Sequence, residues 1–250
     1  MTKTAKPTGY VIYNGESLLD GSPIVAIATL KSRNGKTADM MQVWILRSDI
    51  DPLTANRTGQ DFAICGFCKH RGIPTNRGKG TAAKRTCYVQ IGQAPASVYR
   101  TYKNGRYPAI AGHAALVELG RNRKIRIGAY GDGAALPSYV VESLVSQAKL
   151  HTAYSHQADM DGITFDASHY MQSVDSLEEA HAAWSTGART FRIISDLSEI
   201  VPDKEIACPS LIGKHCADCG LCDGTKRHPN AKSIVIPVHG AGSKHFAATA

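Results

Sequence analysis

The stretch KIRIGAYGDGAALPSYVVESLVSQAKLHTAYS, residues 124–155, decides the fold. Its first seven residues, Lys124–Tyr130, are typical of a β-strand. Pro137–Lys149 has helical spacing with a proline at its start, and His151–Ser155 is typical of a second, short strand. A strand, a helix and a strand in this order imply parallel pairing through a helical crossover.

The same alternation continues toward the C-terminus. Tyr170–Val174 and Thr190–Ile194 are predicted strands, and Ser233–Val238 is a last one. The helix predicted over Ser176–Trp184 begins with a serine that is followed three residues later by a glutamate, which is a capping-box signature. We therefore expect an α/β domain, most simply a complete or partial βα (TIM-like) barrel, with a doubly wound sheet as the alternative.

The N-terminal part of the chain has a different residue pattern. Ile24–Leu30 and Met41–Leu46 are apolar stretches that predict a small strand-rich segment over residues 1–60. Residues 61–250 would form the barrel together with cysteine-rich loops. Within them, Ile64–Ile110 is predicted to be mostly loop with one helix over Ala94–Tyr102.

Composition limits the class of protein. At 250 residues, with 43% hydrophobic and 20% charged residues, the chain suits one ordinary globular domain. The longest apolar run, Ile24–Leu30, is too short for a membrane span, and polar Met1–Gly9 has no signal-peptide core. We expect a cytoplasmic protein without a membrane partner. The net charge of +8 favours anionic partners.

The second half of the chain carries the strongest chemical motif. CPSLIGKHCADCGLC, residues 208–222, places four cysteines within fifteen residues: Cys208, Cys216, Cys219 and Cys222. Two successive C-x2-C steps let one short loop reach different irons of a four-iron, four-sulfur (4Fe–4S) cluster. Zinc also accepts four thiolates, but usually from two pairs separated by a longer spacer. A 4Fe–4S cluster is the expectation, with zinc as the alternative.

An earlier set supplies three cysteines. Cys65 and Cys68 form a C-x2-C pair, and eighteen residues separate Cys68 from Cys87. Three thiolates would leave one iron of a cluster open to a ligand. Two alternatives remain: His70 could complete a closed zinc site, or Cys65 and Cys68 could join two cysteines of the later set around one metal.

Four sequence motifs of this chain resemble those of a known group of proteins. CPSLIGKHCADCGLCDG at Cys208, CYVQIG at Cys87, GAYGDGAALP at Gly128 and MQSVDSLEEA at Met171 are similar to an uncharacterised family of phage- and prophage-encoded iron–sulfur proteins. More distantly, the chain resembles the radical S-adenosylmethionine superfamily. That resemblance implies a cluster on Cys65, Cys68 and Cys87 and a cofactor amino group at Gly131 and Asp132, although Asp132 stands where the superfamily has glutamate. The resemblance to the phage-encoded family implies a location in the host cytoplasm.

Several polar residues are candidates for the site itself. Gly131 and Asp132 lie in a glycine-rich turn at the carboxyl end of a predicted strand, where ligands bind in βα folds. Asp132 is placed there to receive a cation or an amine. His151, Ser155 and His156 on the next strand would face the same end, so we take Asp132, His151 and His156 as candidate catalytic residues and Gly131, Asp132 and Ser155 as candidate cofactor ligands.

A basic segment is the remaining signal. Residues 62–117 contain no Asp or Glu but nine basic residues: Lys69, Arg71, Arg77, Lys79, Lys84, Arg85, Arg100, Lys103 and Arg106. Tyrosines interleave with them, a combination that suits phosphates and stacked bases. The alternatives are a solvated surface or cations that compensate an anionic cluster.

Two functions follow from these motifs. In the first, an open-iron cluster performs redox or radical chemistry on a small molecule or nucleotide, with S-adenosylmethionine as a candidate cofactor. In the second, the metal sites are structural staples and the basic segment binds nucleic acid without catalysis. The sequence lacks a P-loop, a G-x-S-x-G elbow, an H-E-x-x-H pair and a helix-opening G-x-G-x-x-G, which disfavours NTPases, hydrolases, zinc proteases and typical dehydrogenases.

Overall fold

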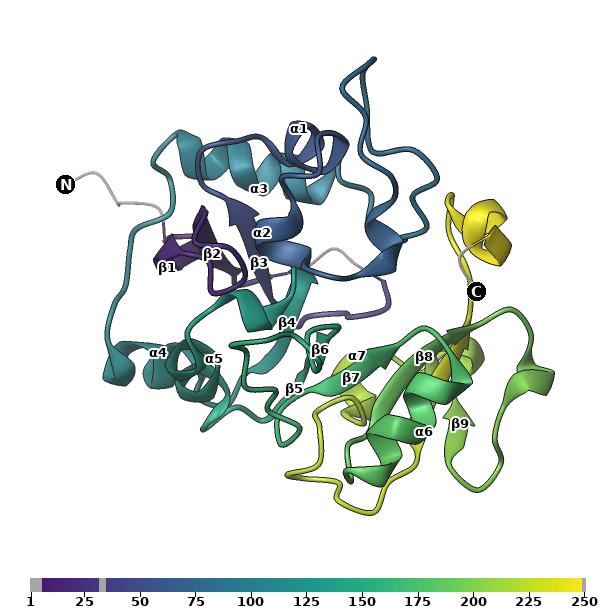
Figure 1. Ribbon diagram of the computed structural model, residues 1–250. Coiled ribbons are helices and arrows are strands. Elements are labelled where there is room, and N and C mark those ends of the chain that lie inside the picture. Colours follow the sequence, from purple (N-terminus) through teal and green to yellow (C-terminus); the bar gives the residue numbers. More distant parts are fainter. Residues whose placement is uncertain (1–5, 32–34, 249–250) are drawn as a thin grey trace.

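Two five-stranded sheets form the framework of the molecule (Figure 1). The computed structural model describes residues 6–31 and 35–248, so the first five residues of the polar segment Met1–Gly9 lie outside the described part. The strands are β1 (Gly9–Glu16), β2 (Pro23–Thr29), β3 (Met41–Arg47), β4 (Lys124–Tyr130), β5 (Leu150–Thr152), β6 (Tyr154–Ser155), β7 (Met171–Val174), β8 (Thr190–Ile194), β9 (Glu205–Ala207) and β10 (Ser233–Pro237).

Short helices connect these strands. They are α1 (Pro52–Arg57), α2 (Phe62–Cys65), α3 (Ala94–Lys103), α4 (His113–Gly120), α5 (Ser138–Val145), α6 (Leu177–Ser185) and α7 (Cys216–Cys219). In the described part of the chain, none of the helices has the length and apolar character needed to cross a membrane.

The barrel expected from the sequence is wrong. The strand orders are β1-β2-β3-β4-β5 in one sheet and β6-β7-β8-β10-β9 in the other. The first sheet is mixed, because β1, β2 and β3 pair antiparallel while β3, β4 and β5 pair parallel. The second sheet is parallel throughout. Two separate sheets therefore replace one closed ring.

The chain passes from one sheet to the other at a single residue. β5 ends at Thr152 and β6 begins at Tyr154, so the strand predicted over His151–Ser155 is divided between the sheets. The backbone N–H of Ala153 donates to the carbonyl of Cys222, and its carbonyl accepts from the N–H of Met171. These bonds hold the two sheets edge to edge with β5 and β6 at the junction (Figure 1).

Most of the apolar core belongs to the first sheet. Every residue of Ile24–Ala28 is fully buried, because β2 is a central strand covered on both faces. Ile125 and Ile127 of β4 and Leu144 of α5 join the same cluster. At Gly120 of α4 an added Cβ would overlap the backbone of Leu144, so a glycine lets α4 lie directly against α5.

The second sheet depends more on buried polar pairs. The guanidinium of Arg192 on β8 donates to both carboxylate oxygens of Glu205 on β9, at 2.9 and 2.7 Å, and both side chains are almost fully buried. The Nε1 of Trp184 donates to Ser233 Oγ at 2.9 Å and so ties α6 to β10. Ser176 caps α6 by accepting from the N–H of Glu179, as its sequence signature predicted.

Candidate metal and ligand-binding site

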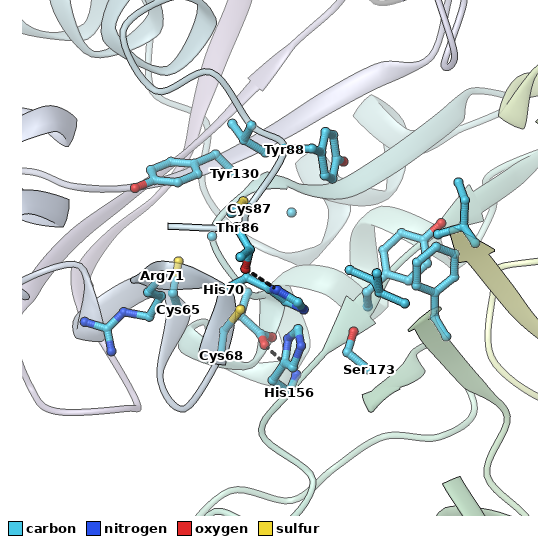
Figure 2. A pocket seen from close by; sticks show the side chains of 18 of the residues that line it. Cys65, Cys68, His70, Arg71, Thr86, Cys87, Tyr88, Tyr130, His156 and Ser173 are labelled. Carbon is cyan, nitrogen blue, oxygen red and sulfur yellow. Dashed lines mark hydrogen bonds between the residues drawn. The ribbon is translucent and has the colours of Figure 1, made fainter. Parts of the chain in front are cut away.

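A cavity of about 220 Å³ lies between the two sheets. Its walls include the carboxyl ends of β4, β6, β7 and β10, the edge that parallel strands commonly use for ligands. Three cysteines of the first set, Cys65, Cys68 and Cys87, line it (Figure 2). Cys208 and Cys216 of the second set line it as well. The fold thus brings the two sets to one cavity.

Local backbone geometry positions the first cysteine set. Cys65 is the last residue of α2, and Gly66 follows with φ +50°. A Cβ at Gly66 would overlap the side-chain amide of Gln157, so both the conformation and the space favour glycine. Gln157 Nε2 donates to the carbonyl of Cys65 at 3.0 Å. In Figure 2 the sulfurs of Cys65, Cys68 and Cys87 are turned toward one space.

Burial of Cys65 and Cys87 disfavours the charged thiolate form of both side chains. Burial raises the pKa of Cys65 well above its usual value, and Asp61 and the neighbouring thiols of Cys68 and Cys87 add to the effect. Burial also raises the pKa of Cys87, while Arg85 opposes the shift. A bound cation would reverse this balance, because thiolates and not thiols ligate metals.

The second cysteine set surrounds a smaller cavity of about 20 Å³ that Cys208, Cys216, Cys219 and Cys222 all line. Burial raises the pKa of Cys222 to about 12, although Tyr154 bonds to its sulfur and opposes the shift. Gly220 ends α7 in the left-handed conformation, with φ +68°, and lets the loop turn back toward Cys222.

Among the described residues, all seven cysteines are free thiols. No three of the seven sulfurs lie within 4.8 Å of one another. The three ligand groups that do so are His70, His156 and Asp175. Nε2 of His70 lies 3.0 Å from Oδ1 of Asp175, and Nε2 of His156 lies 3.8 Å from the same oxygen.

Within this triad, Asp175 and His156 each favour the charged form of the other. Burial alone would raise the pKa of Asp175, but hydrogen bonds and positive charge from His156 and His70 hold it well below the usual range. Burial alone would lower the pKa of His156, but Cys68 and Asp175 raise it well above the usual value. The triad is therefore a compact, strongly polar group in the cavity wall.

Asp132 lies in the cavity wall but its carboxylate is already occupied. Oδ1 accepts from the N–H of Ala134 at 3.0 Å, and Oδ2 accepts from the N–H of His156 at 2.9 Å and from Nε2 of Gln157 at 3.1 Å. Gly131 beside it has φ +85°, and a Cβ there would press on Ile45. The turn is held by backbone contacts, which leaves Asp132 a positioning role.

Only one of the three candidate residues predicted on the strand after Asp132 lines the cavity. His156 lines the cavity, whereas His151 and Ser155 are buried and do not line it. Nε2 of His151 lies 2.9 Å from the carbonyl of His169, and burial lowers the pKa of His151 to about 4. Ser155 Oγ accepts from the N–H of Gln157 at 3.1 Å.

Unpartnered polar atoms concentrate in this cavity. Five buried side-chain N or O atoms in the described part of the chain have no hydrogen-bond partner: His70 Nε2, Arg85 Nη2, Arg126 Nε, Tyr130 Oη and His151 Nδ1. All but the last belong to residues that line the cavity. Because buried polar groups are nearly always paired, such a concentration is typical of a ligand site.

Two of these atoms belong to guanidinium groups. Arg126 on β4 bonds to the hydroxyl of Tyr88 and lies over its ring, and Arg85 Nη1 donates to the carbonyl of Cys87 at 2.8 Å. In the described ranges, no carboxylate lies within 4.0 Å of either guanidinium, as an ion pair would require. The cavity therefore presents cationic donors with unused hydrogen-bonding capacity.

The nine basic residues of the proposed nucleic-acid surface separate into groups. Lys69 pairs with Glu179 at 2.9 Å and Arg71 pairs with Asp61 at 2.6 Å, while Arg85 faces the cavity. The others are exposed: Arg77, Lys79 and Lys84 on the loop after the first cysteine pair, and Arg100, Lys103 and Arg106 on and after α3.

Sequence reasoning missed Asp175 and did not assign the basic residue Arg126 to the cavity. Asp175 follows β7 directly, so the strand-end rule that selected Asp132 would also have found it. Arg126 lies in the middle of β4, and its role depends on the loop that carries Tyr88, which no local pattern indicates. No protein-family model, curated protein or solved structure matches this chain, so a functional assignment depends on the geometry of the cavity.

Proposed function

We propose that this chain is an iron–sulfur protein that performs redox chemistry on a small anionic molecule, such as a nucleotide, bound in the cavity between its sheets. The observation that carries the proposal is that five cysteines from two distant sets line that one cavity. Cysteine thiolates hold iron–sulfur clusters, so cysteines at this cavity could place such a redox group beside a bound molecule.

The sulfurs of the described cysteines stand farther apart than one tetrahedral zinc ion with three or four thiolates requires. Thiolates bound to one tetrahedral zinc, with bonds of about 2.3 Å, stand about 3.8 Å apart. No three of the seven sulfurs approach one another within 4.8 Å. In a cubane each thiolate binds a different iron, so its sulfurs stand farther apart than those on one ion. The resemblance of the cysteine phrases to phage-encoded iron–sulfur proteins supports the same assignment.

The residues of the two sets would have different tasks. Cys208, Cys216, Cys219 and Cys222 supply four thiolates, enough to close one site. Cys65, Cys68 and Cys87 supply three, which would leave one iron of a bound cluster free to take a ligand. When bound, such clusters accept and donate single electrons. Arg71 and Arg85 stand beside the first set and offset the negative charge of its thiolates.

The cavity wall supports an anionic ligand. Arg85 and Arg126 offer unused N–H groups, and Tyr130 offers an unused hydroxyl. Charge-assisted hydrogen bonds from guanidinium groups suit phosphates and carboxylates. S-adenosylmethionine fits less well, because both oxygens of Asp132, which the resemblance assigns to the amino group of that cofactor, already accept N–H donors.

Metal analysis tests the proposal directly. The full chain, purified without oxygen, should be brown and should contain iron together with acid-labile sulfide at about four of each per cluster. The electron paramagnetic resonance signal of the reduced protein should shift when a nucleotide is added, because the ligand sits beside the open iron. Stoichiometric zinc without sulfide would contradict the assignment.

A second candidate function has its own observation. The loop bearing Arg77, Lys79 and Lys84 projects from the body of the molecule, and all three side chains are exposed (Figure 1). Such a loop suits nucleic-acid phosphates. Binding through it should weaken steeply with salt, with a log–log slope of about −0.7 to −0.9 per phosphate contact. Replacing the three residues with glutamine should flatten that slope and leave the iron content unchanged.

A further inference from the structure

Three side chains that can ligate a metal come from separate segments of the chain and meet in the cavity: His70, His156 and Asp175. His70 lies in a 3₁₀ turn (Lys69–Arg71) after the first cysteine pair, His156 follows β6, and Asp175 follows β7. Their ligand atoms lie within 4.8 Å of one another, and all three residues line the cavity. Figure 2 shows the rings of His70 and His156 beside the sulfur of Cys68.

We propose that His70, His156 and Asp175 bind one divalent ion of the zinc or iron(II) class, as a mononuclear site beside the first cysteine set. Two imidazole nitrogens and one carboxylate oxygen are a donor set that these ions favour. Three protein ligands leave further positions of the ion open to the cavity. This site stands on its own donor atoms and does not require the iron–sulfur assignment.

The orientation of His70 supports the proposal most directly. Nδ1 of His70 lies 2.7 Å from Thr86 Oγ1, within hydrogen-bond distance. When Nδ1 donates to that hydroxyl, the lone pair of Nε2 faces the cavity. Nε2 lies 3.0 Å from Oδ1 of Asp175 yet has no aligned hydrogen-bond partner. This spacing suits an ion pair when the imidazole is protonated, and it suits two ligands of one cation when the imidazole is neutral.

The distances agree with this arrangement. Nitrogen and oxygen ligands bound at about 2.0–2.1 Å to a tetrahedral ion stand about 3.3 Å apart. The two nitrogens lie 3.0 and 3.8 Å from Asp175 Oδ1, on either side of that value. The second oxygen, Oδ2, lies 3.9 Å from Nζ of Lys69, which itself pairs with Glu179 at 2.9 Å. Oδ1 therefore remains for the ion.

Hydrogen bonds from neighbouring residues hold each of the three proposed metal-binding residues in place. Thr86 orients His70, and the carboxylate of Asp132 fixes the backbone of His156. The backbone N–H of Asp175 donates to Glu179 Oε2 at 2.7 Å, which anchors it at the start of α6. Partners of this kind are what metal-binding histidines and carboxylates require, and their loss weakens metal binding about 10- to 100-fold.

An ion in this position would act on the same ligand as the arginines. It would polarise an oxygen of an anionic molecule bound in the cavity, because a divalent ion is a Lewis acid. Arg85 and Arg126 would hold the remaining charge of that molecule. The competing role for the triad is to hold a proton beside Cys68, since the His156 ring also bonds to that thiol.

Cobalt(II) is the probe for this site. The full chain, purified without oxygen and dialysed against a mild chelator, is titrated with cobalt(II) while visible absorption is recorded. We expect one equivalent to bind with d–d bands and without sulfur-to-cobalt charge transfer. Asp175→Asn and His70→Gln should weaken binding at least about 100-fold, and Thr86→Val should weaken it about 10- to 100-fold.

Matched controls separate the site from its surroundings. Ser173→Ala and His239→Gln alter residues that line the same cavity outside the triad, and both should keep the wild-type affinity. Circular dichroism and iron content check that each variant is folded. Unchanged cobalt binding in Asp175→Asn and Thr86→Val, or a strong sulfur charge-transfer band, would overturn the proposal. Absence of iron and sulfide from the wild-type chain would instead defeat the iron–sulfur assignment and leave this site standing.

Discussion

Oδ2 of Asp132 accepts a hydrogen bond from the backbone N–H of His156 at 2.9 Å, although the two residues are 24 positions apart. The same oxygen accepts from Nε2 of Gln157, which also donates to the carbonyl of Cys65. Gln157 Oε1 in turn accepts from the N–H of Phe67 at 3.1 Å. One carboxylate thus connects the glycine turn, a proposed metal ligand and the first cysteine loop.

This connection predicts the effect of changing Asp132. Asp132→Asn places an amide N–H₂ where a carboxylate accepted three N–H donors, so at least one buried donor loses its partner. The free energy of unfolding should fall by about 2 kcal/mol, and the first cysteine set should retain less iron. Urea denaturation and iron analysis measure both effects. Exposed Asp159→Asn is the control and should stay within about 0.5 kcal/mol of wild type.

The two cysteine sets should respond differently to single replacements. Cys216→Ala opens a site that its own loop closes, so folded yield should drop, because a structural metal contributes folding free energy directly. Cys87→Ala should leave the fold intact while removing about half of the iron, if each set holds one cluster of this size. Equal losses of iron and stability in the two variants would point to one shared metal site. Iron, sulfide and thermal unfolding are measured side by side.

The limits of sequence-based prediction are visible at particular residues. Lys124–Tyr130 and Thr190–Ile194 are strands with the predicted ends, because local patterning sets where a strand begins and stops. The pattern contains no information on which neighbour each strand takes. The barrel prediction failed at Ala153, where the bonds to Cys222 and Met171 divide one apparent strand between two sheets.

The site shows the same division between local and long-range information. Cysteine spacing identified all seven thiols that the fold gathers at two cavities, and the strand-end rule placed His156 at the larger one. His151 is only five residues away, yet it bonds to the carbonyl of His169 on the far side of the junction between the sheets. The residues that surround a ligand come from contacts such as Arg126 with Tyr88, which no window of sequence contains.

His151 predicts a pH dependence of stability. Burial lowers its pKa to about 4 from the ordinary value of 6.5. The unfolded chain therefore binds a proton at this position at a higher pH than the folded chain does. The stability contributed by neutral His151 is complete above pH 6.5 and is lost as the pH falls toward 4, by about 3 kcal/mol in all.

Substitution isolates this contribution. His151→Gln cannot titrate, so its free energy of unfolding should fall less steeply than that of wild type between pH 6.5 and 4. Urea denaturation at half-unit pH steps gives both curves. Two parallel curves over that range would show that the proton bound on unfolding belongs to another group.

The second sheet should depend on one ion pair. Arg192 and Glu205 are paired by two hydrogen bonds with almost no exposure to solvent, and Oε2 of Glu205 also accepts from the N–H of Val201 at 3.0 Å. Glu205→Gln would remove the buried counter-charge of Arg192 and leave only the more exposed carboxylate of Glu199, 3.8 Å from Nη1. Breaking a buried pair in this way typically costs about 3–5 kcal/mol. Thermal unfolding checks this. The exposed pair Arg121–Glu118 is the control, and Glu118→Gln should cost less than about 1 kcal/mol.

Arg126 should decide the affinity of the cavity for anions. Its guanidinium lies against Tyr88 and beside Tyr154 and Cys216, and although burial opposes its charge, these neighbours raise the pKa of Arg126 further, so it stays charged. Its Nε has no partner, and an anion in the cavity would supply one. Arg126→Gln removes that charge and should weaken inorganic phosphate binding at least about 10-fold, in line with the loss of one charge-assisted hydrogen bond.

The neighbouring lysine makes this measurement specific. Lys124 lies on the same strand, but its Nζ faces Asp218 at 3.2 Å and does not line the cavity. Lys124→Gln therefore removes the same net charge without touching the site, and its phosphate affinity should equal that of wild type in a calorimetric titration at constant ionic strength. Equal weakening in both variants would assign the effect to the overall charge of the protein, because long-range attraction depends on net charge and a bound anion depends on the donor that contacts it.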